Sequence, residues 1–157
     1  MRIGFGYDAH RFTHGRRCVL CGVEIPCAFG PDGHSDADAP LHALIDAMLG
    51  AMALGDIGQY FPESDDRWYD ADSIELLKTV YTLIKRHGYS LGNTDIVIIL
   101  ESPRLSSYIW QMRARIAEAL GEDIDKISVK ATTEEGMGYT GDGTGITSTA
   151  VVLLEKF

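Results

Sequence analysis

Hydrophobic residues return every three or four positions in three stretches of the chain, which is the spacing of a buried helix face. The stretches run from Leu41 to Leu54, from Ile74 to Ile84 and from Ile109 to Leu120. Each is preceded by residues suited to cap a helix and followed by a glycine that can end one. The predicted caps are Asp38 or Ala39, Asp72 or Ser73, and Ser106 or Ser107, and the predicted stop residues are Gly55, Gly88 and Gly121.

Alternating or continuous apolar runs of strand length occupy much of the remaining chain. The predicted strands are Ile3–Phe12 and Cys18–Ile25, which should pair around "THGRR", followed by Asp95–Leu100, "ISVKAT" (127–132) and "ITSTAVVLLE" (146–155). The resulting order of elements is ββααβαββ, with no linker or repeat to divide it. This order predicts an α+β fold, a two-layer sandwich with helices on one face of a mixed β-sheet, as a single domain over residues 1–157.

Composition limits the partners of this domain. The 157 residues include 14 Lys and Arg against 23 Asp and Glu, which gives a formal net charge of -9. Without a broad positive field the chain is expected to bind no nucleic acid and no anionic membrane, so an anionic substrate must be held by local groups. No apolar run approaches the roughly 20 residues that span a bilayer, and no signal or transit peptide pattern opens the sequence. The expected location is cytoplasmic.

The three cysteines are Cys18, Cys21 and Cys27. The first two form a Cys-x-x-Cys pair, which is half of a common zinc motif, but the other half is missing. In a strand, residues three apart point to opposite faces. We therefore favour reduced structural thiols over a metal or redox role.

Residue types that bind metals occur close together in "GYDAH" (6–10). If Asp8 and His10 leave the end of a strand, their side chains project from the same face and can hold one ion. Candidates for a third ligand are His14, His34 and His42. His42 is favoured because it lies in the first turn of a predicted helix, whose positive end keeps the ring neutral, as metal binding requires.

Asp46 follows His42 by four residues, and we expect it to accept the other ring N–H of that histidine. A set of Asp8, His10 and His42 would leave the fourth position of a zinc ion open, as in catalytic zinc sites. The spacing alone also allows a plainer interpretation. In that case Asp8 caps a turn, and the two histidines are partly buried residues without a ligand.

Longer blocks of the chain resemble one enzyme family. The blocks are "GYDAH", "HSDADAPLHALIDAMLGAMALGDIGQYFPESD", "GYSLGNTDIVII" and "VKATTEEGMGYTGDGTGI", in this order, and the resemblance extends from Arg2 to the last predicted strand. They resemble the 2-C-methyl-D-erythritol 2,4-cyclodiphosphate synthases of the non-mevalonate isoprenoid pathway. The resemblance implies conversion of 4-diphosphocytidyl-2-C-methyl-D-erythritol 2-phosphate into the cyclic diphosphate with release of CMP. It also implies a homotrimer with active sites between adjacent subunits.

The resemblance further implies that Asp8, His10 and His42 bind Zn²⁺. It also implies that Glu135 is the sole protein ligand of a Mg²⁺ or Mn²⁺ ion. His34 and Thr133 would be catalytic and stabilise the transition state, and Ser35 would belong to a mobile loop that covers the phosphates. The other implied substrate contacts are Asp56, Ile57, Gly58, Phe61, Pro62, Glu63, Ser64 and Asp65 near the erythritol, Leu100, Glu101, Ser102, Pro103, Arg104, Leu105, Ser106, Ala131 and Thr132 near the cytosine, and Tyr139 and Asp142 in the glycine-rich loop.

One departure from the family pattern concerns Asp142, where many members carry an arginine facing a central channel able to hold isoprenoid diphosphates. A carboxylate at this position would repel such an anion. Two alternatives to the synthase remain. The first is a zinc-dependent nucleotide phosphohydrolase that uses the same ligands, and the second is a zinc-stapled trimeric binding module, which should unfold on chelation.

Overall fold

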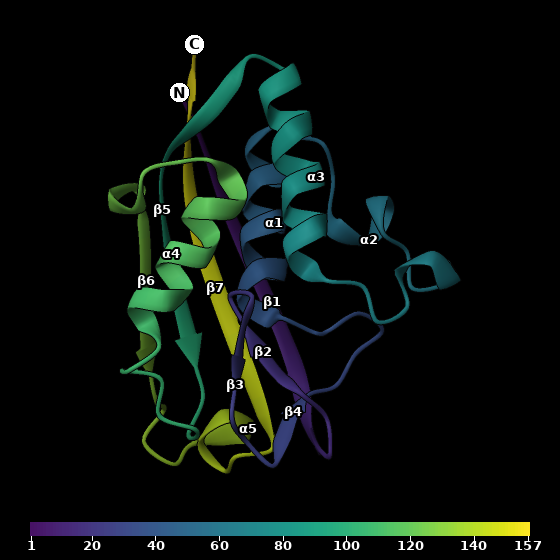
Figure 1. Cartoon of the computed structure of the whole chain (residues 1–157), viewed down its shortest axis with the longest axis vertical. Helices are drawn as coiled ribbons and strands as arrows, with labels where there is room; N and C mark the ends of the chain where they lie inside the picture. Colours follow the sequence, from purple (N-terminus) through teal and green to yellow (C-terminus); the bar gives the residue numbers. More distant parts are fainter.

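The computed structural model describes residues 1–157 as a layer of strands and a layer of helices (Figure 1). A five-stranded mixed sheet has the order β4-β1-β7-β5-β6, and β2 and β3 form a separate hairpin. The strands are β1 Arg2–His14, β2 Cys18–Leu20, β3 Val23–Ile25, β4 Phe29–Pro31, β5 Tyr89–Ile99, β6 Ile127–Thr132 and β7 Gly145–Lys156. The helices are α1 Ala39–Ala51, α2 Ile57–Tyr60, α3 Ser73–Arg86, α4 Ile109–Leu120 and α5 Gly138–Gly141, with 3₁₀ turns at Asp66–Trp68 and Ile124–Lys126.

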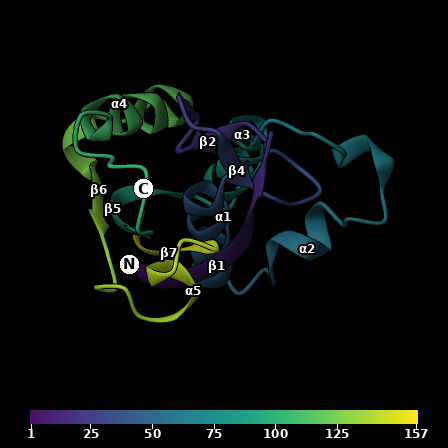
Figure 2. The same cartoon turned by 90° about the horizontal axis from the view of Figure 1, so that it is seen from below.

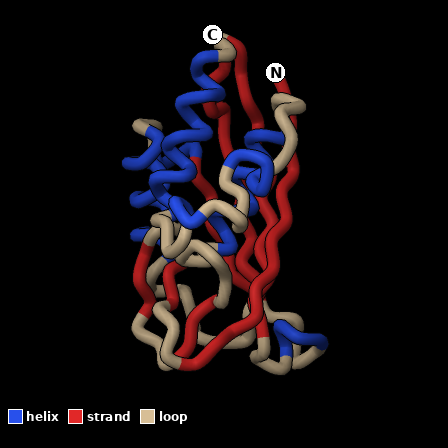
Figure 3. The backbone as a smooth tube through the Cα atoms, turned by 90° about the vertical axis from the view of Figure 1, so that its right-hand side faces the viewer, coloured by secondary structure: helices blue, strands red, loops and turns tan.

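The long helices α1, α3 and α4 lie on one face of the sheet, as the view from below shows (Figure 2). Apolar side chains fill the space between the layers, among them the fully buried Leu44, Leu77, Ile96 and Met112. The predicted α+β sandwich with helices on one face of a mixed sheet is confirmed. The antiparallel pair β1 and β7 brings the two termini to the same end of the molecule (Figure 3). None of the helices combines the length and apolar character needed to cross a membrane.

Two glycines let α1 lie directly on β1. A Cβ atom built on Gly4 would lie 1.8 Å from the carbonyl oxygen of Ala47, and one on Gly6 would lie 1.8 Å from that of Ala43. Any side chain at these positions would push the helix away from the strand. This close approach brings His42, near the start of α1, to the same face of β1 as Asp8.

The predicted pairing of residues 3–12 with residues 18–25 is wrong. The chain instead turns at Cys21 and Gly22, which have φ angles of 52° and 71°, so the segment folds back on itself as the hairpin β2–β3. Two consecutive residues with positive φ are typical of the tight turns that close hairpins. The neighbours of β1 are β7 and the unpredicted short strand β4.

Two of the three predicted N-caps are confirmed. Asp38 accepts a hydrogen bond from the helix backbone at the start of α1, and Asp72 does the same at the start of α3. The cap predicted at Ser106 or Ser107 is wrong, since these residues lie in a turn before α4. The residue at the N-cap position there is Tyr108, which makes no side-chain hydrogen bond to the helix.

Two element boundaries also differ from the prediction. The first helix ends at Ala51 rather than Leu54, because the chain leaves the helical region at Ala53, whose φ is 56°. Strand β5 begins at Tyr89 rather than Asp95, since it pairs with β7 over almost its whole length.

Candidate active site

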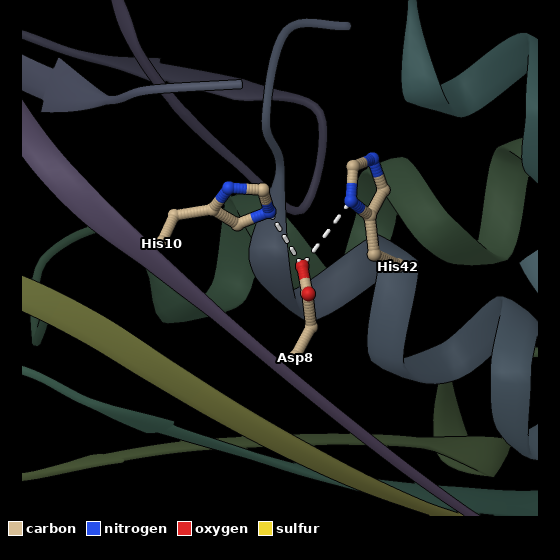
Figure 4. A group of neighbouring side chains, drawn as sticks. All are labelled: Asp8, His10 and His42. Atoms are coloured by element: carbon tan, nitrogen blue, oxygen red, sulfur yellow. Dashed lines mark hydrogen bonds and ion pairs between the residues drawn. The ribbon is translucent and has the colours of Figure 1, made fainter. Parts of the chain in front are cut away.

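Asp8 and His10 lie two positions apart within β1, not at its end as predicted, and both side chains point toward α1 (Figure 4). His42 of α1 points back toward them. The Nε2 atom of His10 lies 2.7 Å from Oδ2 of Asp8, and Nδ1 of His42 lies 3.2 Å from the same oxygen. One ligand atom from each residue lies within 4.8 Å of the others. The three side chains therefore form one compact group of metal-ligand type.

The outer nitrogens of both rings are held as donors. His10 Nδ1 lies 2.8 Å from the carbonyl oxygen of Asp32, which can only accept, so this nitrogen carries the hydrogen. His42 Nε2 lies 2.9 Å from the hydroxyl of Ser73, which itself donates to the carboxylate of Asp36, so His42 donates as well. In the neutral rings, the nitrogens that face Asp8 are therefore acceptors.

Three acceptor atoms that face one another repel unless a cation, either a metal ion or a proton on one of the rings, lies between them. The donor set is two imidazole nitrogens and one carboxylate oxygen, which suits a divalent metal such as zinc. The residues therefore fit a metal ion, and their outer hydrogen bonds fix both rings in the required tautomer.

The ionisation of Asp8 and His10 reflects the same geometry. Burial alone would raise the pKa of Asp8, but hydrogen bonds and charges from the two histidines outweigh it and lower the pKa from 3.8 to about 2. Burial would lower the pKa of His10, yet its hydrogen bond to Asp8 and the carboxylate charge raise that pKa above 6.5. The carboxylate is thus ionised, as a metal ligand must be.

The hydrogen bond predicted from His42 to Asp46 is not formed. Side chains in a helix lean toward its N-terminus, so the His42 ring reaches the loop before α1 and the start of α3 rather than the following turn. Asp46 instead accepts a hydrogen bond of 2.7 Å from the backbone N–H of Ile57. Its carboxylate therefore holds the backbone of Ile57, the first residue of α2.

A cavity of about 150 Å³ adjoins the metal-ligand group. The hydroxyl of Ser35 lies 3.2 Å from His42 Nε2, and the ring of His34 packs edge-on against Tyr69 with centroids 5.5 Å apart. The cavity thus brings together nine predicted site residues, which are Asp8, His10, His34, Ser35, His42, Ile57, Gly58, Phe61 and Glu63.

A second cavity, of about 450 Å³, lies where the parallel strands β5 and β6 end. The carboxyl ends of parallel strands are common ligand-binding positions, because the connecting loops leave a crevice there. The predicted residues that line this cavity are Leu100, Glu101, Pro103, Arg104, Leu105, Ser106, Ala131, Thr132 and Thr133. No residue lines both cavities, and the strands β7 and β5 separate β1 from β6 in the sheet.

Several predicted site residues line neither of these cavities. Asp56 caps α2, and Asp65 pairs with Arg67 at 2.6 Å. The hydroxyl of Tyr139 forms hydrogen bonds with the hydroxyls of Tyr7 and Thr147. The others are Pro62, Ser64, Ser102, Glu135 and Asp142, of which Asp142 accepts from the backbone N–H and hydroxyl of Thr144.

Prediction from the sequence missed five residues of the site. Trp68 and Leu76 line the cavity beside the metal-ligand group, and Ile109 lines the second cavity. The hydroxyl of Ser73 contacts His42 and donates to Asp36. The sequence pattern predicts Ser73 only as a helix cap. Its hydroxyl faces His42 because α3 begins beside α1, and no local pattern in the sequence reveals that contact.

Comparison with known proteins identifies the family. The YgbB family profile matches residues 1–155. The 2-C-methyl-D-erythritol 2,4-cyclodiphosphate synthase of Moorella thermoacetica is 58% identical over 154 residues, which are 98% of this chain and 94% of that protein. Among solved structures, the bifunctional IspDF from Campylobacter jejuni matches with a TM-score of 0.96 at 40% identity, covering 99% of this chain and 42% of that one. A 2C-methyl-D-erythritol-2,4-cyclodiphosphate synthase in its CDP-bound form matches with a TM-score of 0.90 at 36% identity, covering 98% of this chain and 100% of that one. This chain therefore belongs to the YgbB family.

Proposed function

We propose that this protein converts 4-diphosphocytidyl-2-C-methyl-D-erythritol 2-phosphate into 2-C-methyl-D-erythritol 2,4-cyclodiphosphate and CMP. The observation that carries the proposal is the convergence of Asp8, His10 and His42 beside a cavity in a chain of this family. In the reaction, an oxygen of the 2-phosphate bonds to the β-phosphorus of the same substrate molecule. The bond between the β-phosphorus and the oxygen that bridges it to the α-phosphorus breaks, and that oxygen leaves with CMP. Neither water nor a covalent enzyme intermediate is required, so catalysis depends on positioning and on neutralising charge.

The metal that we assign to Asp8, His10 and His42 is Zn²⁺, because these three ligands leave one position open. Bound there, zinc supplies a Lewis acid for the phosphoryl group under attack. His34 and Ser35 line the same cavity, and we assign them to the phosphate oxygens of the substrate. Ile57, Gly58 and Phe61, with their neighbours in the segment 56–65, enclose the erythritol part of the substrate.

Glu135 is the ligand that we assign to a second cation, Mg²⁺ or Mn²⁺. Its side chain is exposed and makes no hydrogen bond or ion pair within the chain, so the carboxylate is free to bind a cation. One carboxylate together with substrate phosphates is a common environment for Mg²⁺. The cation would offset the phosphate charge that a protein of net charge -9 otherwise repels.

The cytidine part of the substrate fits the second cavity. The backbone of Leu100–Ser106 and of residues 131–133 offers N–H and C=O groups for a base edge, and Thr133 offers a hydroxyl for the diphosphate. The CDP-bound structure of a relative supports a nucleotide ligand of this kind. Tyr139 lines a small cavity together with His10, and Asp142 lies in the same loop before β7.

In a homotrimer, the cavity beside the metal-ligand group of one chain would lie next to the second cavity of a neighbouring chain. The side of the sheet without long helices, here called the open face, carries Ile3, Phe5, Tyr7 and Val151, which are 72%, 62%, 53% and 45% exposed. Phe5 lies directly opposite Val151 across β1 and β7, so these side chains form a continuous apolar patch. Patches of this kind mark protein interfaces, and a second copy of this chain is the partner that we assign.

The test is to incubate the pure protein with the cytidyl substrate, Zn²⁺ and Mg²⁺ and to follow the products by phosphorus NMR. The proposal predicts equal amounts of CMP and of a cyclic diphosphate. A phosphohydrolase would instead release a free monophosphate from the substrate by adding water. Unfolding on chelation, with no turnover, would favour the binding module and contradict the proposal.

A further inference from the structure

Arg16 belongs to neither cavity of the proposed site, yet its guanidinium reaches the segment that connects β4 to α1. Its Nε atom donates to the carbonyl oxygen of Pro31 at 2.7 Å, and its Nη2 atom donates to those of Gly33 at 2.9 Å and Ser35 at 2.5 Å. Only 26% of the side chain is exposed. One partly buried cation thus holds three backbone carbonyls of the segment 31–35.

The carbonyls bound by Arg16 belong to alternate residues of the segment 31–35, which bends at residues 33–35 around the guanidinium. The other two carbonyls of the segment are those of Asp32 and His34. Those two carbonyls also have partners. The oxygen of Asp32 accepts from His10 Nδ1 at 2.8 Å, and the oxygen of His34 accepts from the N–H of Asp70 at 2.8 Å. Arg16 therefore holds three carbonyls of the segment, while a fourth, that of Asp32, fixes the tautomer of His10, a proposed metal ligand.

The segment also packs closely on the metal-ligand group. A Cβ atom built on Gly33 would lie 3.1 Å from Cε1 of His10, so the backbone lies directly against that ring. The next two residues are His34 and Ser35, which line the cavity beside the metal-ligand group. A small displacement of this segment would therefore move His10, His34 and Ser35 together.

We propose that Arg16 is a positioning residue that holds the segment 31–35 so that its groups meet the metal ligands and the substrate phosphates. The proposal rests on the proposed function and adds a residue outside the substrate contacts. Arginine suits the role because its planar guanidinium presents several N–H donors in a fixed geometry, whereas lysine presents a compact charge that cannot reach all three carbonyls.

The test compares Arg16→Lys and Arg16→Gln with the matched control Arg17→Lys. Arg17 is the adjacent arginine, but it is exposed and pairs only with Glu24, at 3.1 Å. We expect both Arg16 variants to lower kcat for CMP release by about 10- to 100-fold, since small misplacements of catalytic groups have effects of this size. The melting temperature should stay close to that of the control, and KM should change less than kcat. An equal kcat in the Arg16 and Arg17 variants would overturn the proposal, as would a loss of activity fully accounted for by unfolding.

A second measurement does not depend on turnover. Amide hydrogen exchange at residues 33–36 should be faster in Arg16→Lys than in Arg17→Lys, in protein that remains folded. The nitrogen NMR signals of His10 should also show a mixture of tautomers in the metal-free Arg16 variant. If the wild type releases no CMP, the proposed function is wrong, but the exchange and tautomer measurements still test the role of Arg16. Unchanged exchange and an unchanged His10 tautomer would overturn it.

Discussion

Asp8 shares one carboxylate oxygen between two imidazole rings, so its charge is the centre of the metal-ligand group. We predict that Asp8→Ala and His42→Ala lose bound zinc and all measurable turnover while remaining folded, because each removes one of three ligands and neither side chain belongs to the apolar core. Elemental analysis of the purified variants checks this. Zinc content equal to that of the wild type would contradict the assigned site.

Ser73 lies one step outside the metal-ligand group, because its hydroxyl accepts from His42 and donates to Asp36. We predict that Ser73→Ala lowers zinc affinity by about 10- to 100-fold, which is the usual effect of removing a residue that orients a metal ligand. Ser73→Thr keeps the hydroxyl and should bind zinc as the wild type does. Competition with a zinc chelator measures both affinities, and equal affinities would show that Ser73 does not orient His42.

How much of this site could be predicted from the sequence depends on how local each contact is. Asp8 and His10 could be paired because strand residues two apart share a face. The contacts of Ser73 and Arg16 could not, since they join segments far apart in the chain that meet only once the helices have packed. The hydrogen bond predicted from His42 to Asp46 does not form, because helical side chains lean toward the N-terminus of the helix and not toward the following turn.

At the scale of elements, the contact between β1 and α1 decides where His42 lies. We predict that Gly6→Ala destabilises the fold by about 1–3 kcal/mol or more, because its Cβ would lie 1.8 Å from the Ala43 carbonyl oxygen and must displace α1. Zinc binding should weaken as His42 moves away from Asp8. Gly50→Ala is the control, since its Cβ meets nothing closer than 4.0 Å and alanine favours a helix. Thermal melting of both variants makes the comparison, and equal stability would contradict the argument.

The hairpin β2–β3 leads to a prediction about thiol chemistry. Burial raises the pKa of Cys18 to about 12 and also raises that of Cys21, so neither is a reactive thiolate near pH 8. Iodoacetamide at pH 8 should label both thiols only after unfolding, as mass spectrometry of the digested protein can show. The pKa of Cys18 in the folded protein lies above its usual 9.0. Keeping this thiol protonated therefore contributes to the free energy of unfolding fully below pH 9, and the contribution declines as the pH rises toward 12. Rapid labelling of either thiol in the folded protein would contradict this assignment.

The hairpin also shows where prediction of elements from sequence fails. "CVLCGVEI" has the composition of one strand, and only the positive φ angles at Cys21 and Gly22 divide it. A glycine in an apolar run is compatible with a strand, a bulge or a turn, so the pattern alone did not decide. The long helices, in contrast, were predicted to within a few residues, because the apolar stripe that identifies each one also packs against the sheet.

At the scale of the whole molecule, the cavity beside the metal-ligand group (the metal side) and the cavity at the ends of β5 and β6 (the cytidine side) share no residue, and the open face of the sheet carries an apolar patch. If each active site combines the metal-side cavity of one chain with the cytidine-side cavity of its neighbour, a defect in one half can be complemented by a chain with a defect in the other. His42→Ala disables the metal side. Ala131→Trp fills the second cavity, which Ala131 lines, and disables the cytidine side. Each variant alone should therefore be inactive.

Mixed assemblies should behave differently. When equal amounts of the two variants are unfolded and reassembled together, a site is intact if its metal side comes from the Ala131→Trp chain and its cytidine side from the His42→Ala chain. Random assembly in a closed three-membered ring makes about a quarter of the sites intact, so CMP release should recover to about a quarter of the wild-type rate. The measurement requires native mass spectrometry, to verify that both chains share one trimer. If verified mixed trimers stay inactive, each chain owns a complete site, and the open face serves assembly alone.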